Sequence, residues 1–310
     1  MVAARIVSLI PSATEIVAAL DCTDRLVGRS HECDVPTAVA TLPICSEPRI
    51  DVNGTSRQID DRVKAALQDA LSVYRVHTDV LQQLQPSVIL TQAQCDVCAV
   101  NLSDVQESVC ELTGCDPAVV SLTPMQLSDV WDDIRRVAQA LDVPAKGDAV
   151  VADLQRRLKE LRTLTAAQPQ RPRVACIEWI EPLMVAGNWI PELVEIAGGE
   201  SLLSVAGEHS PWLEWDALVA ADPDRIVVVP CGFGLDRTAG EMSTLESHPA
   251  WSQLRAVQNG HVYLIDGHHY FNRPGPRLVE SAEILAEILH PEAARFGHEG
   301  TGWRRWAGQG

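Results

Sequence analysis

Apolar residues recur at three- and four-residue steps through the middle of the chain, in the stretch Asp148–Leu164. This spacing is typical of a helix with one apolar stripe, and the stretch contains no Gly or Pro. The stripe consists of Val150, Val151, Leu154, Leu158, Leu161 and Leu164. A helix of this length spans about 25 Å, which is enough to connect two domains. We therefore predict a connecting helix over about 146–167.

Short apolar runs alternate with helical patterns on both sides of that helix. LQQLQPSVILT (81–91) in the first half corresponds to LVAADPDRIVVV (218–229) in the second, and Arg173–Trp179 is a strand of the same type as Arg5–Ile10. Strands that alternate with helices predict parallel sheets with right-handed crossovers. The repeated order favours an internal duplication. We expect an α/β fold with an N-terminal lobe over 1–145 and a C-terminal lobe over 168–310.

Charge and composition narrow the partners and the location. The net charge of −17 disfavours nucleic acid, because phosphate binding needs clustered Lys and Arg. No apolar run approaches the roughly 20 residues of a membrane span. The opening residues lack the long apolar core of a signal peptide, and nine scattered cysteines form a poor disulfide framework. These features predict a cytoplasmic protein, or a periplasmic one if a leader precedes this sequence.

Ligands of parallel α/β sheets bind beyond the carboxyl ends of the strands, so the loops that leave the strands hold the candidates. Aromatic residues gather in the second-half loops, as a pocket for a large flat ligand requires; the alternative is that some of them pack beneath the loops. The candidate ligand-binding residues are Pro11, Ser12, His31, Glu32 and Gln92 in the first half, and Glu178, Trp179, Trp189, His209, Trp212, Phe233, His269, Tyr270 and Arg273 in the second.

Cysteines at predicted strand ends suggest a second kind of site. Cys95 and Cys98 form a single CxxC, which without a second pair is a poor zinc site and is compatible with a redox motif or with two buried thiols. Cys176 and Cys231 lie at predicted strand ends in the second half. If these thiols meet in one cleft with nearby imidazoles, they would suit a soft or borderline transition metal. These four cysteines are the candidate metal ligands.

Motifs of enzymes are scarce. The chain has no G-x-S-x-G elbow, no P-loop, no HExxH and no GxGxxG after its first strand. A non-catalytic binding protein is therefore the first interpretation. The alternative is a cytoplasmic thiol-dependent metal-binding protein or enzyme that uses Cys and His in the same cleft.

Several stretches carry a family resemblance. RIVSLIPSATEIVAAL, LQPSVILTQ, DPDRIVVV and VYLIDGHHYFNRPGPRLVESAEILAEIL resemble the iron-siderophore and cobalamin class of ABC-transporter substrate-binding proteins, and the cobalamin-binding members are closest in pattern. The resemblance implies two Rossmann-like lobes joined by a single long rigid helix, with the ligand in a cleft between them. It also implies a corrinoid or similar metal-chelate ligand and an ABC-transporter permease as partner. Family members are exported or lipid-anchored and do not have thiol-rich clefts. The predicted cytoplasmic location and the cysteines at predicted strand ends both differ from this pattern.

Overall fold

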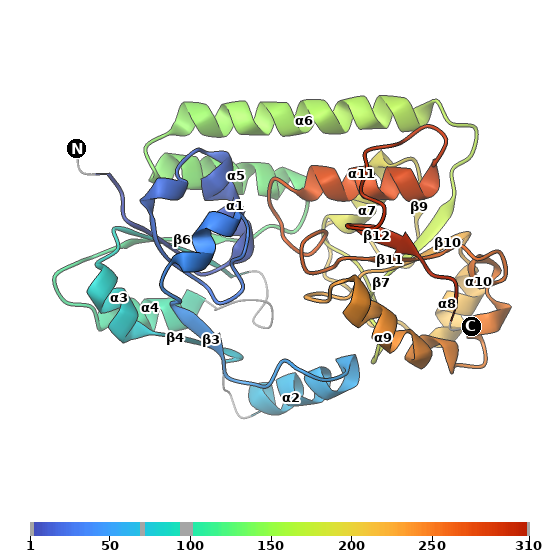
Figure 1. The fold of residues 1–310 in the computed structure, drawn as a ribbon, viewed down its shortest axis with the longest axis horizontal. Helices are drawn as coiled ribbons and strands as arrows, with labels where there is room; N and C mark the ends of the chain where they lie inside the picture. Colours follow the sequence, from blue (N-terminus) through green and yellow to red (C-terminus); the bar gives the residue numbers. More distant parts are fainter. Residues whose placement is uncertain (1–2, 69–71, 94–101, 309–310) are drawn as a thin grey trace. The chain divides into compact units, whose positions relative to one another are not determined.

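The computed structural model describes residues 3–68, 72–93 and 102–308 (Figure 1). The chain divides into two compact units. The first unit consists of Met1–Gly54, Gln58–Pro124 and Ser128–Asp153, and the second consists of Thr55–Arg57, Met125–Leu127 and Leu154–Gly310.

The first unit is built on a parallel sheet with the strand order β2-β1-β5-β6. Its apolar strands are buried by helices, as parallel sheets require. The strands are β1 (Ile6–Ser8), β2 (Leu26–Arg29), β5 (Val88–Gln92) and β6 (Ala118–Leu122), and an antiparallel pair, β3 (Ser46–Pro48) and β4 (Tyr74–Val76), lies apart from them. The helices are α1 (Pro11–Ala19), α2 (Ser56–Gln68), α3 (Thr78–Leu84), α4 (Leu102–Cys110) and α5 (Leu127–Ala140).

The second unit is built on a sheet with the order β12-β11-β10-β7-β8, and β9 also pairs with β7. The strands are β7 (Arg173–Trp179), β8 (Met184–Val185), β9 (Glu200–Ser201), β10 (Arg225–Val228), β11 (Val262–Ile265) and β12 (Trp303–Arg305). The helices are α7 (Ile190–Ile196), α8 (Trp215–Ala221), α9 (Leu235–Glu246), α10 (Arg255–Gln258) and α11 (Leu278–Leu289). Strands β7, β9, β10 and β11 run parallel, and the edge strands β8 and β12 run antiparallel to their neighbours.

The two units share one order of parallel strands. In the first unit the leading strand β1 lies between β2 and β5, and β6 lies outside β5. In the second unit the leading strand β7 pairs with β9 and β10, and β11 lies outside β10. The repeated sequence pattern thus corresponds to a repeated topology.

Helix α6 (Pro144–Ala166) begins in the first unit and ends in the second (Figure 1). It starts before the predicted stretch because Pro is favoured in the first helical turn. This turn passes so close to Ala138 that position 147 requires glycine: a Cβ atom there would lie 2.5 Å from the Cβ of Ala138. The predicted stripe is buried at Val151, Leu154, Leu158 and Leu161, but Leu164 is exposed. Thr165 takes the last buried position, and its hydroxyl donates to the carbonyl of Ile196 at 2.8 Å.

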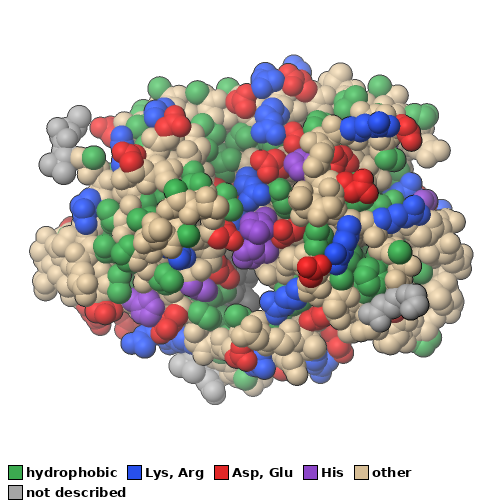
Figure 2. All heavy atoms as spheres, viewed as in Figure 1, with side chains coloured by type: hydrophobic (Ala, Val, Ile, Leu, Met, Phe, Trp, Pro, Cys, Tyr) green, Lys and Arg blue, Asp and Glu red, His purple; other side chains and the backbone are tan. Residues whose placement is uncertain are grey.

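The sequence pattern did not predict the antiparallel strands. Strands β3, β4, β8 and β12 contain two or three residues each, which is too short for a period-two pattern. Within the described part of the chain, no helix combines the length and the apolar character that a membrane span needs. Acidic and basic side chains are intermixed on the face that Figure 2 shows.

Candidate functional site

The turn that follows β1 in the first unit is tightly bonded. The Thr14 hydroxyl donates to Ser8 Oγ at 2.8 Å and contacts Cys33 Sγ at 3.0 Å, and the Ser8 hydroxyl donates to the carbonyl of Ile10 at 3.0 Å. The candidates Pro11 and Ser12 begin α1 and are both buried. Gln92, the last residue of β5, is also buried, at 3% exposure. In this conformation the three candidates present little surface to a ligand.

His31 and Glu32 follow β2 and remain partly exposed. His31 Nδ1 is hydrogen-bonded to Ser46 Oγ at 3.1 Å, and its ring lies 5.5 Å from the ring of Tyr74. Burial lowers the pKa of His31, and the charge of Arg29 adds to this effect while the Ser46 contact opposes it. The neutral imidazole is therefore the favoured form, which can accept as well as donate a hydrogen bond.

Glu178 and Trp179 are the last two residues of β7 in the second unit. The hydroxyl of Ser210 donates to Glu178 Oε2 at 2.6 Å and accepts the backbone N–H of Gly187 at 2.9 Å. These bonds fix the Glu178 carboxylate against a neighbouring loop. His209, next to Ser210, is exposed. The bond from Ser210 thus joins the end of β7 to the loop that holds His209.

An aromatic pair with a guanidinium forms at the ends of β7 and β10. The rings of Trp179 and Phe233 meet edge to face, with centroids 5.4 Å apart. Arg237 of α9 places its Cζ 3.7 Å from the Phe233 ring centroid. Phe233 is only 1% exposed, so it supports the half-buried Trp179 and Arg237 from below. A flat apolar surface next to a cation is the result.

The loop after β11 gathers imidazole and guanidinium groups. Asp266 Oδ2 accepts a hydrogen bond from His269 Nδ1 at 2.8 Å, and Asp266 Oδ1 accepts the backbone N–H groups of His268 and His269 at 3.0 Å each. Arg273 Nη2 donates to His268 Nε2 at 3.1 Å. Burial by itself would raise the pKa of Asp266, but the bonds from His269 and His268 outweigh it and lower that pKa. Asp266 thus orients the ring of His269, and Arg273 holds the ring of His268.

Trp189 and Phe271 hold this loop in place from the interior of the unit. Trp189 Nε1 donates to the carbonyl of Phe271 at 2.7 Å, and the Phe271 N–H donates to Ser281 Oγ at 3.0 Å. Phe271 has a φ of 65°, which is costly for an aromatic residue and persists because these bonds fix it. Trp189 is 4% exposed and Phe271 is fully buried. The candidate Trp189 therefore packs beneath the loop, and the candidate Phe233 is buried as well. For these two residues the structure agrees with the alternative interpretation, in which some of the aromatic residues pack beneath the loops.

The thiol candidates are only partly described. Cys95 and Cys98 lie outside the described residues. Cys176, in β7, is 3% exposed, and burial raises its pKa to about 12, so it stays protonated at neutral pH. Cys231, after β10, is partly exposed. A protonated, buried thiol is a poor metal ligand, because the thiolate is the species that binds metal.

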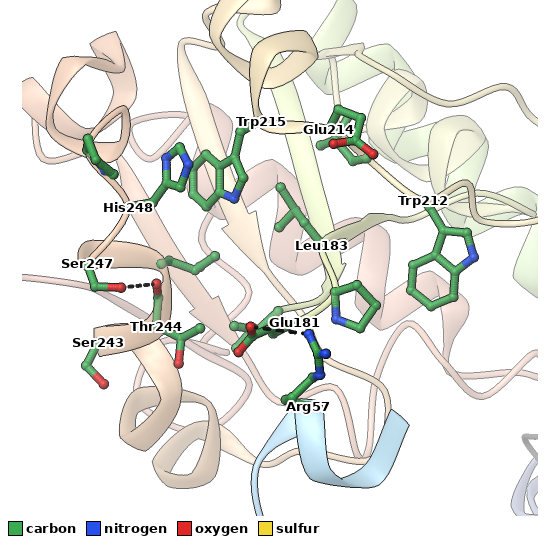
Figure 3. Close-up of a pocket in the computed structure, with 15 residues that line it drawn as sticks. Arg57, Glu181, Leu183, Trp212, Glu214, Trp215, Ser243, Thr244, Ser247 and His248 are labelled. Atoms are coloured by element: carbon green, nitrogen blue, oxygen red, sulfur yellow. Dashed lines mark hydrogen bonds and ion pairs between the residues drawn. The ribbon is translucent and has the colours of Figure 1, made fainter. Parts of the chain in front are cut away.

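Trp212 lies in a different place, a groove of about 750 Å³ in the second unit (Figure 3). The Trp212 side chain is 58% exposed at one side of the groove. Trp215 and His248 stack at the other side, with ring centroids 3.9 Å apart. The residues that line the groove are Arg57, Ile180, Glu181, Pro182, Leu183, Trp212, Leu213, Glu214, Trp215, Ser243, Thr244, Leu245, Ser247, His248 and Pro249.

The sequence analysis did not select several of the residues that lie together at the carboxyl ends of the second-unit strands. Asp266 stands three residues before His269, and this spacing in a loop was a usable signal. Arg237, Arg277 and Ser210 carried no such signal, because an isolated Arg or Ser in an α/β chain is most often a surface residue. The second-unit site is the set that gathers at the carboxyl ends of β7, β10 and β11: Glu178, Trp179, Ser210, Phe233, Arg237, Asp266, His268, His269, Tyr270, Arg273 and Arg277.

Comparisons with known proteins give this site a context. A family model described as periplasmic binding protein matches residues 6–268. The chain is similar to an uncharacterized ABC transporter substrate-binding lipoprotein, YvrC, of Bacillus subtilis, with 24% identity over 93% of this chain and 80% of the relative. It is also similar to the vitamin B12-binding protein of Vibrio vulnificus, with 22% identity over 91% of this chain and 89% of the relative. Among solved structures, a periplasmic heme binding protein from Pseudomonas aeruginosa shares the fold, with a TM-score of 0.73, 20% identity and 99% coverage of both chains.

These relatives correct the predicted location. The cytoplasmic prediction is wrong, because the matching family is one of periplasmic binding proteins and the Bacillus subtilis relative is a lipoprotein. The findings point to a location outside the cytoplasm. The alternative of a cytoplasmic thiol-dependent protein finds no support among them. The prediction was wrong because the opening residues of the given sequence do not determine the location of the protein.

The predicted family is confirmed by the same findings. The matching family model covers most of the chain, and the two parallel-sheet units with their connecting helix agree with the predicted α/β architecture. The members of this family are substrate-binding proteins, so a binding role follows from membership. The chain belongs to the periplasmic binding protein family, as a substrate-binding component of the ABC-transporter type.

Proposed function

We propose that the chain binds a corrinoid, such as cobalamin, or a related metal chelate of the tetrapyrrole kind. The observation that carries the proposal is the second-unit site, where aromatic rings, guanidinium groups and oriented imidazoles gather at the carboxyl ends of three parallel strands. Flat rings match the face of a macrocycle, and guanidinium N–H groups can donate to the amide carbonyls at the edge of a corrinoid or to the carboxylates of haem. Similarity to a vitamin B12-binding protein supports the corrinoid as the first candidate.

Haem is the second candidate, and the arginines favour it. Arg237 lies over Phe233, Arg277 lies over Tyr270, and Arg273 is bonded to His268. Guanidinium groups pair with carboxylates in a two-pronged geometry, and haem carries two carboxylates at one edge. Similarity of fold to a periplasmic heme binding protein agrees with this choice.

A ligand panel tests the proposal. The full chain is titrated with cobalamin, cobinamide, haem and a ferric siderophore, by absorbance and by calorimetry. We expect one of the first three to bind with a Kd far below 1 mM, which corresponds to about −4 kcal/mol. Failure of all four to bind more tightly than that would rule out this class of ligand.

The ligand would pass to an ABC-transporter permease, which we propose as the macromolecular partner. Membership of the family supports this, and the Bacillus subtilis relative is an ABC transporter substrate-binding lipoprotein. The test is the ATPase rate of a reconstituted cognate transporter with the loaded protein. A rate that does not rise above that of the transporter alone would contradict the proposed partnership.

A further inference from the structure

The C-terminal segment (290–305) is fastened to α11 by one buried carboxylate. Glu287 is 5% exposed and accepts the indole N–H of Trp303 at 2.7 Å. It also accepts the backbone N–H groups of Phe296 and His298. Hydrogen bonds to an ionised group are about twice as strong as neutral ones, so the segment is firmly anchored. The family model ends at residue 268, so the family match says nothing about this segment.

The anchored segment places His298 against a second carboxylate. His298 Nε2 lies 3.2 Å from Glu283 Oε2, and Arg157 Nη2 donates to Glu283 Oε1 at 2.7 Å. The His298 and Glu283 side chains are only 16% and 12% exposed, so solvent screens their interaction weakly. The hydrogen bond with Glu283 raises the pKa of His298, although burial opposes it. The charged imidazolium is thus the favoured form.

His298 also contacts the ring of Tyr270, which belongs to the second-unit site. The two rings meet edge to face, with centroids 6.1 Å apart and an interplanar angle of 69°. On the same ring Arg277 places its Cζ 4.5 Å from the centroid, and Arg277 Nε donates to Glu280 Oε2 at 3.2 Å. Tyr270 therefore contacts two groups, His298 and Arg277, that are each bonded to a carboxylate of α11.

Three carboxylates lie around His298. The charged and titratable groups that face it or its partners are Glu280, Glu283 and Glu287 of α11, Arg157 of α6, and Tyr270 and Arg277 of the preceding loop. The three carboxylates all favour the protonated imidazole. Loss of the proton at higher pH removes the charge that Glu283 and the Tyr270 ring both contact.

We propose that His298 is a positioning residue that holds Tyr270 in the second-unit site through its charged pair with Glu283, and so makes ligand affinity depend on pH. The inference rests on the proposed function in one respect, that Tyr270 touches the ligand. Below the pKa of His298 the ring is fixed and the site is pre-organised. Above it the ring moves more freely, and binding must supply the cost of ordering it.

The first experiment follows the ring without any ligand. The chain contains three tyrosines, so ring-labelled tyrosine gives three sets of NMR signals, and Tyr270→Phe assigns one of them. We expect the Tyr270 signal to shift with pH around a midpoint above the ordinary histidine value of about 6.5. In His298→Gln that shift should disappear, and in Glu283→Gln its midpoint should fall. Tyr263, which contacts Trp303 instead, is the internal control.

The second experiment measures affinity with haem and cobalamin as probes at pH 6 and pH 9. We expect the wild-type Kd to be about 2- to 10-fold higher at pH 9 than at pH 6. The Kd of His298→Gln should equal the wild-type value at pH 9 at both pH 6 and pH 9. Equal affinities at both pH values in wild type, or a Tyr270 signal unmoved by His298, would overturn the inference and leave the proposed function intact. A Tyr270 signal that follows His298 in a protein that binds neither probe would contradict the proposed function and support the positioning role. The wild-type titration decides the matter if a variant fails to fold.

Discussion

Each unit contains a histidine packed against a tyrosine ring, but the two pairs have opposite electrostatic surroundings. In the first unit His31 lies 5.5 Å from the Tyr74 ring, and burial lowers its pKa. In the second unit His298 lies 6.1 Å from the Tyr270 ring, and its bond to Glu283 raises its pKa.

The difference comes from the nearest carboxylate. Glu283 lies 3.2 Å from the ring nitrogen of His298, whereas the Glu32 carboxylate lies 4.0 Å from that of His31, whose other nitrogen is bonded to the hydroxyl of Ser46. A direct bond to an ionised group outweighs the cost of burial, and a hydroxyl does not. The histidine of the pair is therefore a neutral hydrogen-bonding group in the first unit and a cation in the second.

Removal of the anchor of the C-terminal segment should break the second pair and leave the first intact. We expect Glu287→Ala to lower the free energy of unfolding by about 3 kcal/mol or more, because several buried N–H donors lose their acceptor. Glu292→Ala is the matched control, since the Glu292 side chain is 93% exposed and pairs with exposed Arg295. Urea unfolding measures both. A loss below about 1 kcal/mol in Glu287→Ala would mean that the segment is held by other contacts.

Loss of the support beneath the loop after β11 should lower the free energy of unfolding by less than loss of the Glu287 anchor. Trp189→Phe removes the donor to the Phe271 carbonyl and should cost about 1–2 kcal/mol, because that buried carbonyl loses its bond. The exposed Trp212 offers the control, and Trp212→Phe should change stability by less than about 0.5 kcal/mol. Thermal unfolding of both variants checks the ranking. Equal losses would show that the bond to Phe271 contributes nothing.

The two histidines should give opposite pH dependences of stability. The folded pKa of His298 is raised, so its contribution is fully present below the unfolded value of about 6.5 and is lost as pH rises through the folded pKa. The folded pKa of His31 is lowered, so its contribution is present above about 6.5 and is lost as pH falls through the folded pKa. Urea midpoints from pH 5 to 9 are measured for wild type, His31→Gln and His298→Gln. The same pH slope in both variants would contradict the comparison.

The smallest effect is expected at the CxxC of the first unit. We expect Cys95→Ser with Cys98→Ser to leave probe affinity within about twofold of wild type, since the buried Cys176 is protonated and offers no thiolate to complete a cluster. Trp179→Ala, in the second-unit site, should weaken binding clearly and is the comparison variant. Metal analysis of the purified chain accompanies the titration. A stoichiometric metal that disappears in the double variant would restore the thiol-site hypothesis.

Much of the fold was predictable because it rests on long periodic patterns. The stripe of α6 and the buried strands β5 and β7 are strong signals of this kind, and the connecting helix and the parallel sheets followed from them. The short edge strands β8 and β12 have no period to detect. Their pairing depends on which neighbouring strand offers an open edge, and that is a property of the assembled sheet.

The candidate site was predictable only as a set of loops. The rule that ligands bind beyond strand ends selected the loop that holds His269 and Tyr270. It could not separate the partly exposed Trp179, at the end of β7, from the buried Trp189, after β8, because the difference between them lies in their packing. The contact of His298 with Tyr270 depends on the folding back of a segment 28 residues further along the chain, which no local pattern encodes.

The most direct test of the central claim is a calorimetric titration of wild type, Tyr270→Ala and Trp212→Ala with cobalamin and haem. It asks whether the ligand binds at the second-unit site rather than in the groove that Trp212 lines. We predict that Tyr270→Ala weakens binding about 10-fold or more, which corresponds to about 1.4 kcal/mol, and that Trp212→Ala stays within about twofold. Unchanged affinity in Tyr270→Ala together with a loss in Trp212→Ala would place the ligand in the groove and contradict the claim.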